Sequence, residues 1–219
     1  MVIRQRAIQA EDKQERQQAI LDAAARLLAR SPERIANMAD VADEAGLAKG
    51  TVYLYFPSKE ELLLAVHERN IDGFFRALIA RLESDEPTRI QDVLALTHRH
   101  IVEPPLFLPL AARCFGLMAQ SVPPETSLAF KQRMAERLMR AGAGLERHFS
   151  QLAPGGGLAL LRHSYALIIG LWQMSPNGSG PSICPGAGEL PAAMSYTYPE
   201  ELDRALLALW NGTITGEAR

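Results

Sequence analysis

A short stretch, GLAKGTVYLYFP from Gly46 to Pro57, holds a lysine, a threonine and two tyrosines, all of which can form hydrogen bonds. A helix this short is marginal on its own in water, so it needs support from neighbouring elements. Val52 and Phe56, four residues apart, can pack inward and hold it in place. The lysine, threonine and tyrosine side chains of the stretch then face outward, where they could contact the phosphates and base edges of DNA.

The flanking elements predict how this stretch is positioned. Asn37 is a suitable N-cap for a helix that ends at Gly46, where a left-handed residue is favoured, and a second helix follows over residues 49–55. Two helices joined by a tight glycine turn form a helix-turn-helix, whose second helix enters the major groove of DNA. The residues predicted to form the DNA-binding surface are Asn37, Lys49, Gly50, Thr51, Tyr53, Leu54, Tyr55 and Lys59.

Charge limits how the first part of the chain can bind DNA. Residues 1–60 hold nine basic and nine acidic side chains, so binding has to rely on local placement, with Asp43 and Glu44 turned away from the DNA. Residues 1–13 are expected to form a basic arm, which could reach an adjacent minor groove or remain a solvated terminus. The formal net charge of −2 excludes a globally basic, histone-like protein.

Composition and motifs argue against several other classes. Two distant cysteines, Cys114 and Cys184, do not form a disulfide framework and suit a cytoplasmic protein. No signal-peptide pattern occurs, and the longest apolar run is too short to span a bilayer, so we expect no membrane association. His98 and His100 face different sides of a helix, and no catalytic or phosphate-binding motif occurs. We therefore expect no metal, no cofactor and no enzymatic activity.

The apolar spacing predicts an all-α protein. A first helix is expected over residues 14–29, and Ser58 is expected to cap a long helix that reaches about Leu82, with Glu61 completing a capping box. Residues 175–198 are rich in glycine, proline and serine and are expected to form a long functional or mobile loop. Further helices are predicted over residues 88–102, 109–120, 124–152, 157–174 and 199–211.

The stretch ADVADEAGLAKGTVYLYFPSKEEL, from Ala39 to Leu62, resembles the tetracycline-repressor (TetR) family of bacterial transcription regulators. The resemblance implies a basic arm over residues 1–13, a three-helix DNA-binding domain over 14–75 and an effector-binding and dimerisation domain over 76–219. Two positions depart from the family pattern. Ala48 replaces a serine or threonine cap, and Ala39 replaces a longer polar residue that reads a base in some members.

The family resemblance also implies a homodimer, in which the helices over 157–174 and 199–211 of each subunit form a four-helix bundle. The first of these helices is apolar nearly all round, which implies burial on two sides. A plain internal core helix is the alternative interpretation. The candidate interface residues are Leu161, Ile168, Leu202, Leu206, Leu209 and Trp210.

An effector pocket is expected between the middle helices, and the alternative for each candidate, favoured over ligand contact, is a core residue. Arg113 could meet a carboxylate or phosphate, or form a salt bridge with Glu103. The mostly apolar candidates predict a hydrophobic or amphipathic small molecule. The candidate pocket residues are His98, Phe107, Arg113, Cys114, Met118, Tyr165 and Trp172.

These observations favour a homodimeric repressor that binds a palindromic double-stranded DNA operator and is released by a small-molecule effector. Whether the protein represses or activates is not encoded in these patterns. One alternative is a DNA-binding or architectural protein without an effector, which a filled pocket would favour. Another is a small helical enzyme with Cys114 as its nucleophile, which would require a nearby base and a stabilised thiolate.

Overall fold

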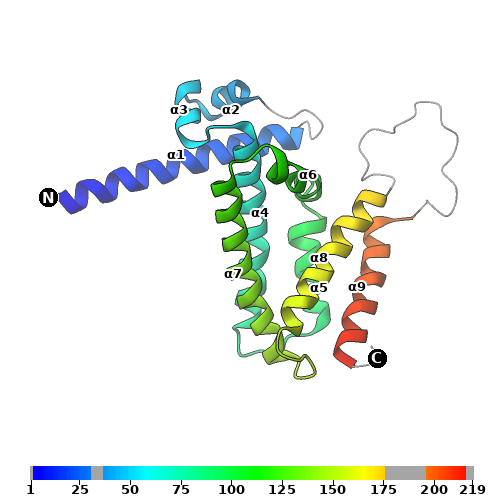
Figure 1. The fold of residues 1–219 in the computed structure, drawn as a ribbon. Coiled ribbons are helices and arrows are strands. Elements are labelled where there is room, and N and C mark those ends of the chain that lie inside the picture. The colour runs from blue at the N-terminus through cyan, green and yellow to red at the C-terminus, as the bar shows by residue number, and fades with distance from the viewer. Residues whose placement is uncertain (1, 31–36, 176–195, 216–219) are drawn as a thin grey trace, which may run out of the picture.

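The computed structural model describes residues 2–30, 37–175 and 196–215, and side chains for all of these except residues 2–11, 115 and 117–120. The described residues form helices and connecting turns and contain no strand, so the all-α prediction is confirmed. The helices divide into a small group at one end of the molecule and a larger bundle (Figure 1). Most of the predicted loop over 175–198 lies outside the described residues.

The small group consists of α1 (Val2–Arg30), α2 (Met38–Ala45), α3 (Lys49–Tyr55) and the first turns of α4 (Lys59–Leu82). The apolar stripe predicted on the first helix faces this group's core. α1 begins at Val2 and not at about Gln14, so the residues expected to form an arm are helical and run out from the body of the molecule (Figure 1). The core side chains are Ile20, Ala23, Ala24, Leu28, Met38, Val41, Val52, Phe56, Leu62, Leu63 and Val66.

The larger bundle continues with α5 (Ile90–Thr97), the π-helix η1 (His98–Val102), α6 (Phe107–Gln120), α7 (Pro124–His148), α8 (Gly156–Met174) and α9 (Tyr198–Thr215). Three of its predicted helices differ from the structure in type or by four residues at one end. The helix expected over 88–102 starts at Ile90 and changes from α to π at His98. The one expected over 124–152 ends at His148, and the one expected over 199–211 continues to Thr215.

α4 joins the two groups because it contributes side chains to both cores. Leu62 and Val66 belong to the core of the small group, whereas Ile71, Phe74 and Leu78 belong to the core of the bundle. No proline interrupts the helix, so its hydrogen-bonded backbone passes directly from one core to the other. The domain boundary expected between residues 75 and 76 falls inside this helix.

Ion pairs fasten α4 to α7 along the outside of the bundle. The Nε and Nη2 groups of Arg133 donate hydrogen bonds to the two carboxylate oxygens of Glu68, at 2.6 and 2.7 Å. Arg137 donates to the same carboxylate at 3.2 Å. One turn further along α4, Arg137 also lies 3.3 Å from Asp72. Burial raises the pKa of Glu68, but the hydrogen bonds from the two arginines outweigh it and hold that pKa below its ordinary value.

α7 and α8 approach each other so closely that their contact requires glycine. A Cβ atom added to Gly142 of α7 would lie 2.8 Å from the backbone nitrogen of Leu158, and one added to Gly157 of α8 would clash with the carbonyl oxygen of Gly142. Glu146 strengthens this crossing, because its carboxylate accepts hydrogen bonds from the backbone N–H groups of Gly155 and Gly157 at 2.9 and 3.1 Å. The Glu146 side chain of α7 therefore caps the first turn of α8.

Three aromatic side chains, two on α9 and one just before it, form hydrogen bonds to α8. The hydroxyl of Tyr198 donates to the carbonyl of Ile168 at 2.9 Å, and that of Tyr196 donates to Leu171 at 2.6 Å. Further along α9, the indole N–H of Trp210 donates to the hydroxyl of Ser164 at 2.9 Å. Burial raises the pKa of Tyr198, so its hydroxyl stays protonated and remains a donor.

We predict that Gly157→Ala lowers the free energy of unfolding by about 1–3 kcal/mol, because the added methyl group forces two helix backbones apart. Urea denaturation monitored by circular dichroism measures the change. Gly116→Ala is the control, since Gly116 is exposed on α6 and a Cβ there meets no atom within 4 Å. That control should be neutral or slightly stabilising, and equal losses in both variants would contradict the close-packing explanation.

Candidate nucleic-acid interface and internal cavity

The turn between α2 and α3 has the geometry of a helix-turn-helix. Gly46 has a φ of 66°, and its N–H donates to the carbonyl oxygens of Ala42 and Asp43, which ends α2. At the other end, the side-chain oxygen of Asn37 accepts hydrogen bonds from the backbone nitrogens of Ala39 and Asp40, at 2.9 and 2.8 Å. Because Asn37 commits its oxygen to this cap, its amide NH₂ group is left as the part that could contact DNA.

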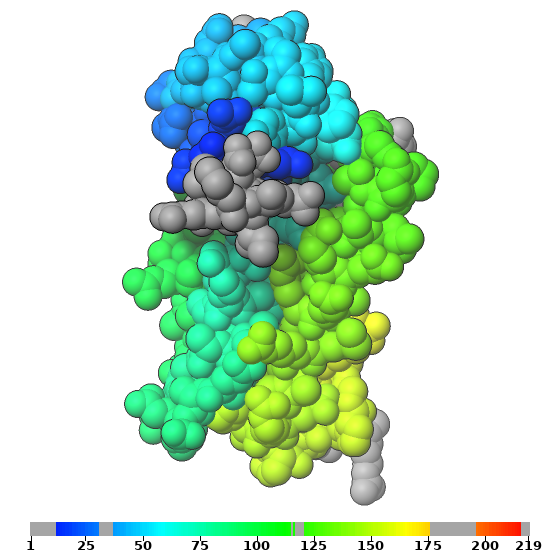
Figure 2. All heavy atoms as spheres, turned by 90° about the vertical axis from the view of Figure 1, so that its left-hand side faces the viewer, coloured from blue at the N-terminus to red at the C-terminus, as the bar shows by residue number. Residues whose placement is uncertain are grey.

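α3 packs through two residues and presents the others outward. Val52 and Phe56 are buried, as their four-residue spacing predicts, whereas Leu54 is 84% exposed and Tyr53 is 42% exposed. The Lys49 ammonium lies 5.9 Å from the centre of the Tyr53 ring, so these two side chains share one outer face of the helix. α2 and α3 form the blue-to-cyan end of the molecule, above the green and yellow bundle (Figure 2).

The other residues predicted to bind DNA lie around this face and differ in how exposed they are. Lys49 and Gly50 are exposed, and Thr51, Tyr55 and Lys59 are half-buried. Ala48 precedes α3 without a side-chain cap, as expected from its departure from the family pattern. Ser58 caps α4 by accepting from the backbone nitrogen of Glu61 at 3.1 Å, and its hydroxyl donates to the Glu61 carboxylate at 3.0 Å.

Two arginines of α1 hold the acidic end of α2. Glu44 accepts from Arg26 at 2.7 Å and from Arg30 at 2.8 Å, and these hydrogen bonds lower the pKa of Glu44. The carboxylate expected to turn away from the DNA is thus bound to α1. This arrangement fixes α2 against α1 and keeps one negative charge on the α1 side of the small group.

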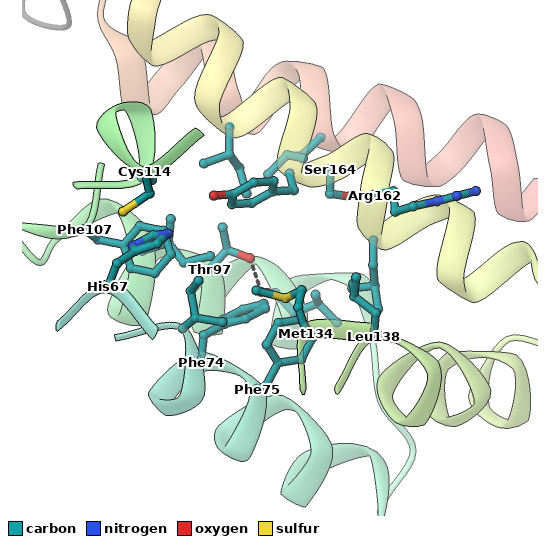
Figure 3. A pocket seen from close by; sticks show the side chains of 18 of the residues that line it. His67, Phe74, Phe75, Thr97, Phe107, Cys114, Met134, Leu138, Arg162 and Ser164 are labelled. Atoms are coloured by element: carbon teal, nitrogen blue, oxygen red, sulfur yellow. Dashed lines mark hydrogen bonds between the residues drawn. The ribbon is translucent and has the colours of Figure 1, made fainter. Parts of the chain in front are cut away.

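A cavity of about 560 Å³ lies inside the bundle, between α4, α5, α6, α7, α8 and α9. Its wall is mostly apolar and aromatic. His67, Phe107 and Cys114 lie at one end of the labelled side chains, and Arg162 and Leu138 lie at the other (Figure 3). The lining includes His67, Ile71, Phe74, Phe75, Thr97, Ile101, Phe107, Cys114, Phe130, Met134, Leu138, Leu161, Ser164, Tyr165, Ile168, Leu206 and Trp210.

Three of the predicted pocket residues, Phe107, Cys114 and Tyr165, line this cavity. His98 does not, because its Nε2 is 2.6 Å from the Asp203 carboxylate, which ties η1 to α9. Arg113 is exposed, and both it and the half-buried Trp172 lie outside the wall. The side chain of Met118 is outside the described residues.

The residues predicted for the dimer interface lie mainly in the core of a single chain. Leu161, Ile168, Leu202, Leu206 and Trp210 are buried there, and all of them except Leu202 line the cavity. Residues buried in this way offer little surface to a second subunit, so the dimer proposed below uses other residues of the same two helices. A helical stripe identifies residues that are buried but not the surface that buries them. Leu209 is half-buried and packs on the edge of this core.

His67 is a polar residue of the cavity wall that the sequence analysis did not identify. It lies on the apolar face of α4, four residues after Leu63 and four before Ile71, where a polar residue is unexpected. The side chain is 2% exposed, and its Nδ1 has no hydrogen-bond partner among the described residues. Its ring meets the Phe107 ring edge-on, with centroids 5.4 Å apart. The interruption of an apolar stripe by one histidine was the available signal.

The environment of Cys114 does not suit a nucleophile. Its side chain is 1% exposed, and burial raises the pKa of the thiol to about 12. The thiol is therefore protonated at neutral pH, which argues against the enzyme alternative. Within the described ranges, no group of three or more histidine, cysteine or acidic side chains could hold a metal ion. None of the helices searched there is long and apolar enough to cross a membrane.

Two family models match the chain. Residues 20–66 match bacterial regulatory proteins of the tetR family, and residues 68–217 match the tetracyclin repressor-like C-terminal domain. The chain belongs to the tetR family, whose members are bacterial regulatory proteins. The resemblance that the Ala39–Leu62 stretch indicated is confirmed. The chain is thus classed as a transcription regulator of the DNA-binding type.

Individual relatives match over parts of their length. The fatty acid metabolism regulator protein of Bacillus subtilis is 34% identical over 79 residues, which are 35% of this chain and 39% of that protein. The uncharacterised HTH-type transcriptional regulator YfiR of the same organism is 40% identical over 68 residues, or 31% and 33% of the two chains. The match therefore spans well under half the length of these curated relatives.

Solved structures share the fold over most of the chain. PfmR, a TetR family regulator from Thermus thermophilus, aligns with a TM-score of 0.53 at 19% identity, over 91% of this chain and 99% of PfmR. SmeT, the repressor of the Stenotrophomonas maltophilia multidrug efflux pump SmeDEF, aligns with a TM-score of 0.51 at 21% identity, over 91% and 89%. At such identities the likeness concerns the fold alone.

We predict that His67 makes the protein less stable in mild acid. Burial lowers the pKa of His67 from 6.5 to about 4, although the Glu68 carboxylate opposes this shift. Between these two values the unfolded chain binds a proton that the folded chain does not. The contribution of His67 is therefore constant above pH 6.5 and falls as the pH drops towards 4, by up to about 3 kcal/mol.

Urea unfolding at several pH values, for wild type and His67→Phe, measures this contribution. Carboxylates with lowered pKa values, such as Glu68, lose stabilisation on acidification in both proteins, so the difference between the two curves isolates His67. The wild-type curve should fall more steeply than that of the variant between pH 6.5 and 4. Parallel curves would show that the imidazole is not desolvated.

Proposed function

We propose that this TetR-family regulator is a homodimeric repressor that a hydrophobic or amphipathic small molecule releases from a palindromic operator. The observation that carries the proposal is the path of α4. The helix begins directly after the DNA-facing α3 and then forms part of the wall of the 560 Å³ cavity. A molecule bound in the cavity would therefore contact the same helix that positions the DNA-binding domain.

The proposed DNA contacts are made by the outward side chains of α3 and its neighbours. Lys49 would bind a phosphate or a guanine, and the Tyr53 and Tyr55 hydroxyls would reach phosphates or bases. Leu54, which cannot hydrogen-bond, would contact a thymine methyl group. Thr51 and Lys59 would complete the surface, with Gly50 allowing close approach of the DNA backbone.

The cavity supports an effector over a purely architectural role. A bundle without a ligand would gain stability by filling this space, because unfilled volume in a core costs packing contacts. To change the free form from mostly DNA-competent to mostly incompetent, from 99:1 to 1:99, an effector needs about 5.5 kcal/mol of preference for the incompetent form. A mostly apolar wall of this size can supply that through burial of an apolar ligand.

The proposed dimer uses the outer faces of α8 and α9 and not the core residues first assigned to it. After the core has formed, both helices still carry small and apolar residues that are exposed or half-buried. These are Ala166, Leu167, Gly170, Leu171 and Met174 on α8, and Ala205, Ala208, Leu209 and Gly212 on α9. A second copy packed there would cover them and form a four-helix bundle.

Selection of duplexes from a random DNA pool at a fixed, near-physiological salt concentration tests the proposed function. A dimeric helix-turn-helix protein should enrich a palindrome whose half-sites are about one helical turn, 34–36 Å, apart. Enrichment of no sequence, with only weak and salt-sensitive binding, would contradict the proposal. The selected duplex then serves as the operator in the measurements below.

Lys49→Ala should weaken operator binding by about tenfold and reduce the slope of log affinity against log salt by about one per subunit, because one phosphate contact is lost. Fluorescence anisotropy with the labelled operator at several salt concentrations measures both quantities. Lys131→Ala is the matched control, since this exposed lysine is on α7 in the bundle. Unchanged affinity in Lys49→Ala, or an equal loss in both variants, would remove Lys49 from the interface.

Arginine at the proposed dimer face should separate the subunits without unfolding them. We expect Ala166→Arg with Ala208→Arg to sediment as a monomer in analytical ultracentrifugation, because both side chains are exposed on a single chain but would be covered in the dimer. Ala143→Arg, on the exposed side of α7, should leave the wild-type dimer intact. A double variant that sediments like wild type would show that the subunits meet elsewhere or do not meet.

A further inference from the structure

The cavity wall contains a buried polar atom for which the described part of the chain offers no hydrogen-bond partner. The Nδ1 of His67 has no partner in the described structure, although the side chain is 2% exposed. Leaving a buried polar group unpaired costs free energy, and such groups are uncommon in folded proteins. Since burial lowers the pKa of His67 to about 4, the imidazole is neutral at physiological pH. A neutral imidazole offers one hydrogen-bond donor and one acceptor.

Other polar groups in the same wall are already satisfied. The Thr97 hydroxyl donates to the carbonyl of Val93 at 2.9 Å, and the Ser164 hydroxyl donates to Leu160 at 2.8 Å. The indole of Trp210, in turn, donates to the Ser164 hydroxyl. His67 thus differs from these neighbours in having a ring nitrogen without a partner among the described residues. This atom is itself buried, so the ring has to turn for a molecule in the cavity to reach it.

The position of His67 connects the cavity to the DNA-binding domain. The preceding residue, Val66, is buried in the core of the small group, and so is Leu110 of α6. His67 itself packs against Phe107 of α6, one turn before Leu110. A ligand group that reaches His67 therefore contacts the place where α4 and α6 pass from one core to the other.

We propose that His67 determines the specificity of the cavity by hydrogen-bonding, through Nδ1, an uncharged hydroxyl, carbonyl or amide group on an otherwise apolar effector. The inference rests on the proposed function, because it assumes that the cavity takes an effector. An ionised group at this position would lose its hydration without gaining a buried counter-charge. The cationic wall residues Lys131 and Arg162 are exposed, and Arg162 lies at the opposite end of the labelled side chains (Figure 3).

The affinities of two ligands for wild type and for His67→Phe form a thermodynamic cycle. The cycle separates the contribution of the hydrogen bond from that of burying an apolar ligand. The probes are 1-octanol and 1-chlorooctane, which differ in the hydroxyl, and their dissociation constants are measured by isothermal titration calorimetry. We expect His67→Phe to weaken 1-octanol binding by about tenfold or more, because one hydrogen bond is lost. The affinity for 1-chlorooctane should change by less than about threefold, since it makes no such bond.

Two further variants control for shape and for loss of any wall hydroxyl. His67→Gln keeps a hydrogen-bonding group and should bind 1-octanol within about threefold of wild type. Thr97→Val removes a hydroxyl that already has its partner and should leave the ratio between the two probes unchanged. His67→Phe should unfold at the same or a higher temperature than the ligand-free wild type, because it removes an unsatisfied group. A purely structural histidine would instead make that variant less stable.

Several outcomes would overturn the inference. Equal losses of both probes in His67→Phe, or equal losses of 1-octanol in His67→Phe and His67→Gln, would show that shape decides binding. Octanoate binding with the same dependence on His67 would overturn the uncharged class. Wild-type protein that binds neither 1-octanol nor 1-chlorooctane would overturn both this inference and the effector role of the cavity.

Operator binding, measured in the same preparations, separates the inference from the proposed function. If 1-octanol binds through His67 but does not release the operator, the ligand chemistry stands and the release mechanism fails. If the protein binds no operator at all, the regulatory proposal fails, while the calorimetric cycle still decides the role of His67.

Discussion

Helix α4 packs into both the small group and the bundle, so its position fixes how the two are arranged. Its buried residues are divided between two cores, so neither core can form fully unless α4 is in place. A continuous α-helix transmits displacement along its axis, and packed interiors do not deform gradually. A change in the packing around Phe74 or Phe75 must therefore be absorbed by the ion pairs to α7 or be passed towards α3. The Glu68–Arg133 pair lies on that route and resists small displacements.

The interior of the bundle combines two features that lower stability, an open apolar space and a histidine whose Nδ1 has no partner among the residues that the structure describes. Both lie at the same place, against α4 and α6. Natural proteins tolerate such features where function needs them and compensate elsewhere. Here the close α7–α8 crossing at Gly142 and the bidentate Arg133–Glu68 pair stabilise the surrounding shell. The shell can therefore hold its shape around a space that its own side chains do not fill.

Features that depend on residues close together in the sequence could be predicted, whereas features that depend on distant partners could not. Asn37, Gly46 and Ser58 act on backbone groups within a few residues, so the helix-turn-helix and its caps were predictable. The partners of α8 and α9 were not, because the stripe that includes Leu161 has the same spacing whether it faces a core, a cavity or another subunit. Likewise, the change to a π-helix at His98 and its pairing with Asp203 depend on elements far apart in sequence.

The hydrogen bonds from Tyr198 and Trp210 to α8 limit how the bundle can move. They join α9 to α8 at Ile168 and Ser164, one turn apart on α8, and each bond would break if one helix slid along the other. Sliding between these two helices is therefore costly, and the pair behaves as one rigid unit. Adjustment to a bound molecule must then take place on the opposite side of the cavity, among α4, α5 and α6. The outer surface of α8 and α9 would keep the same contour while the inner wall changes.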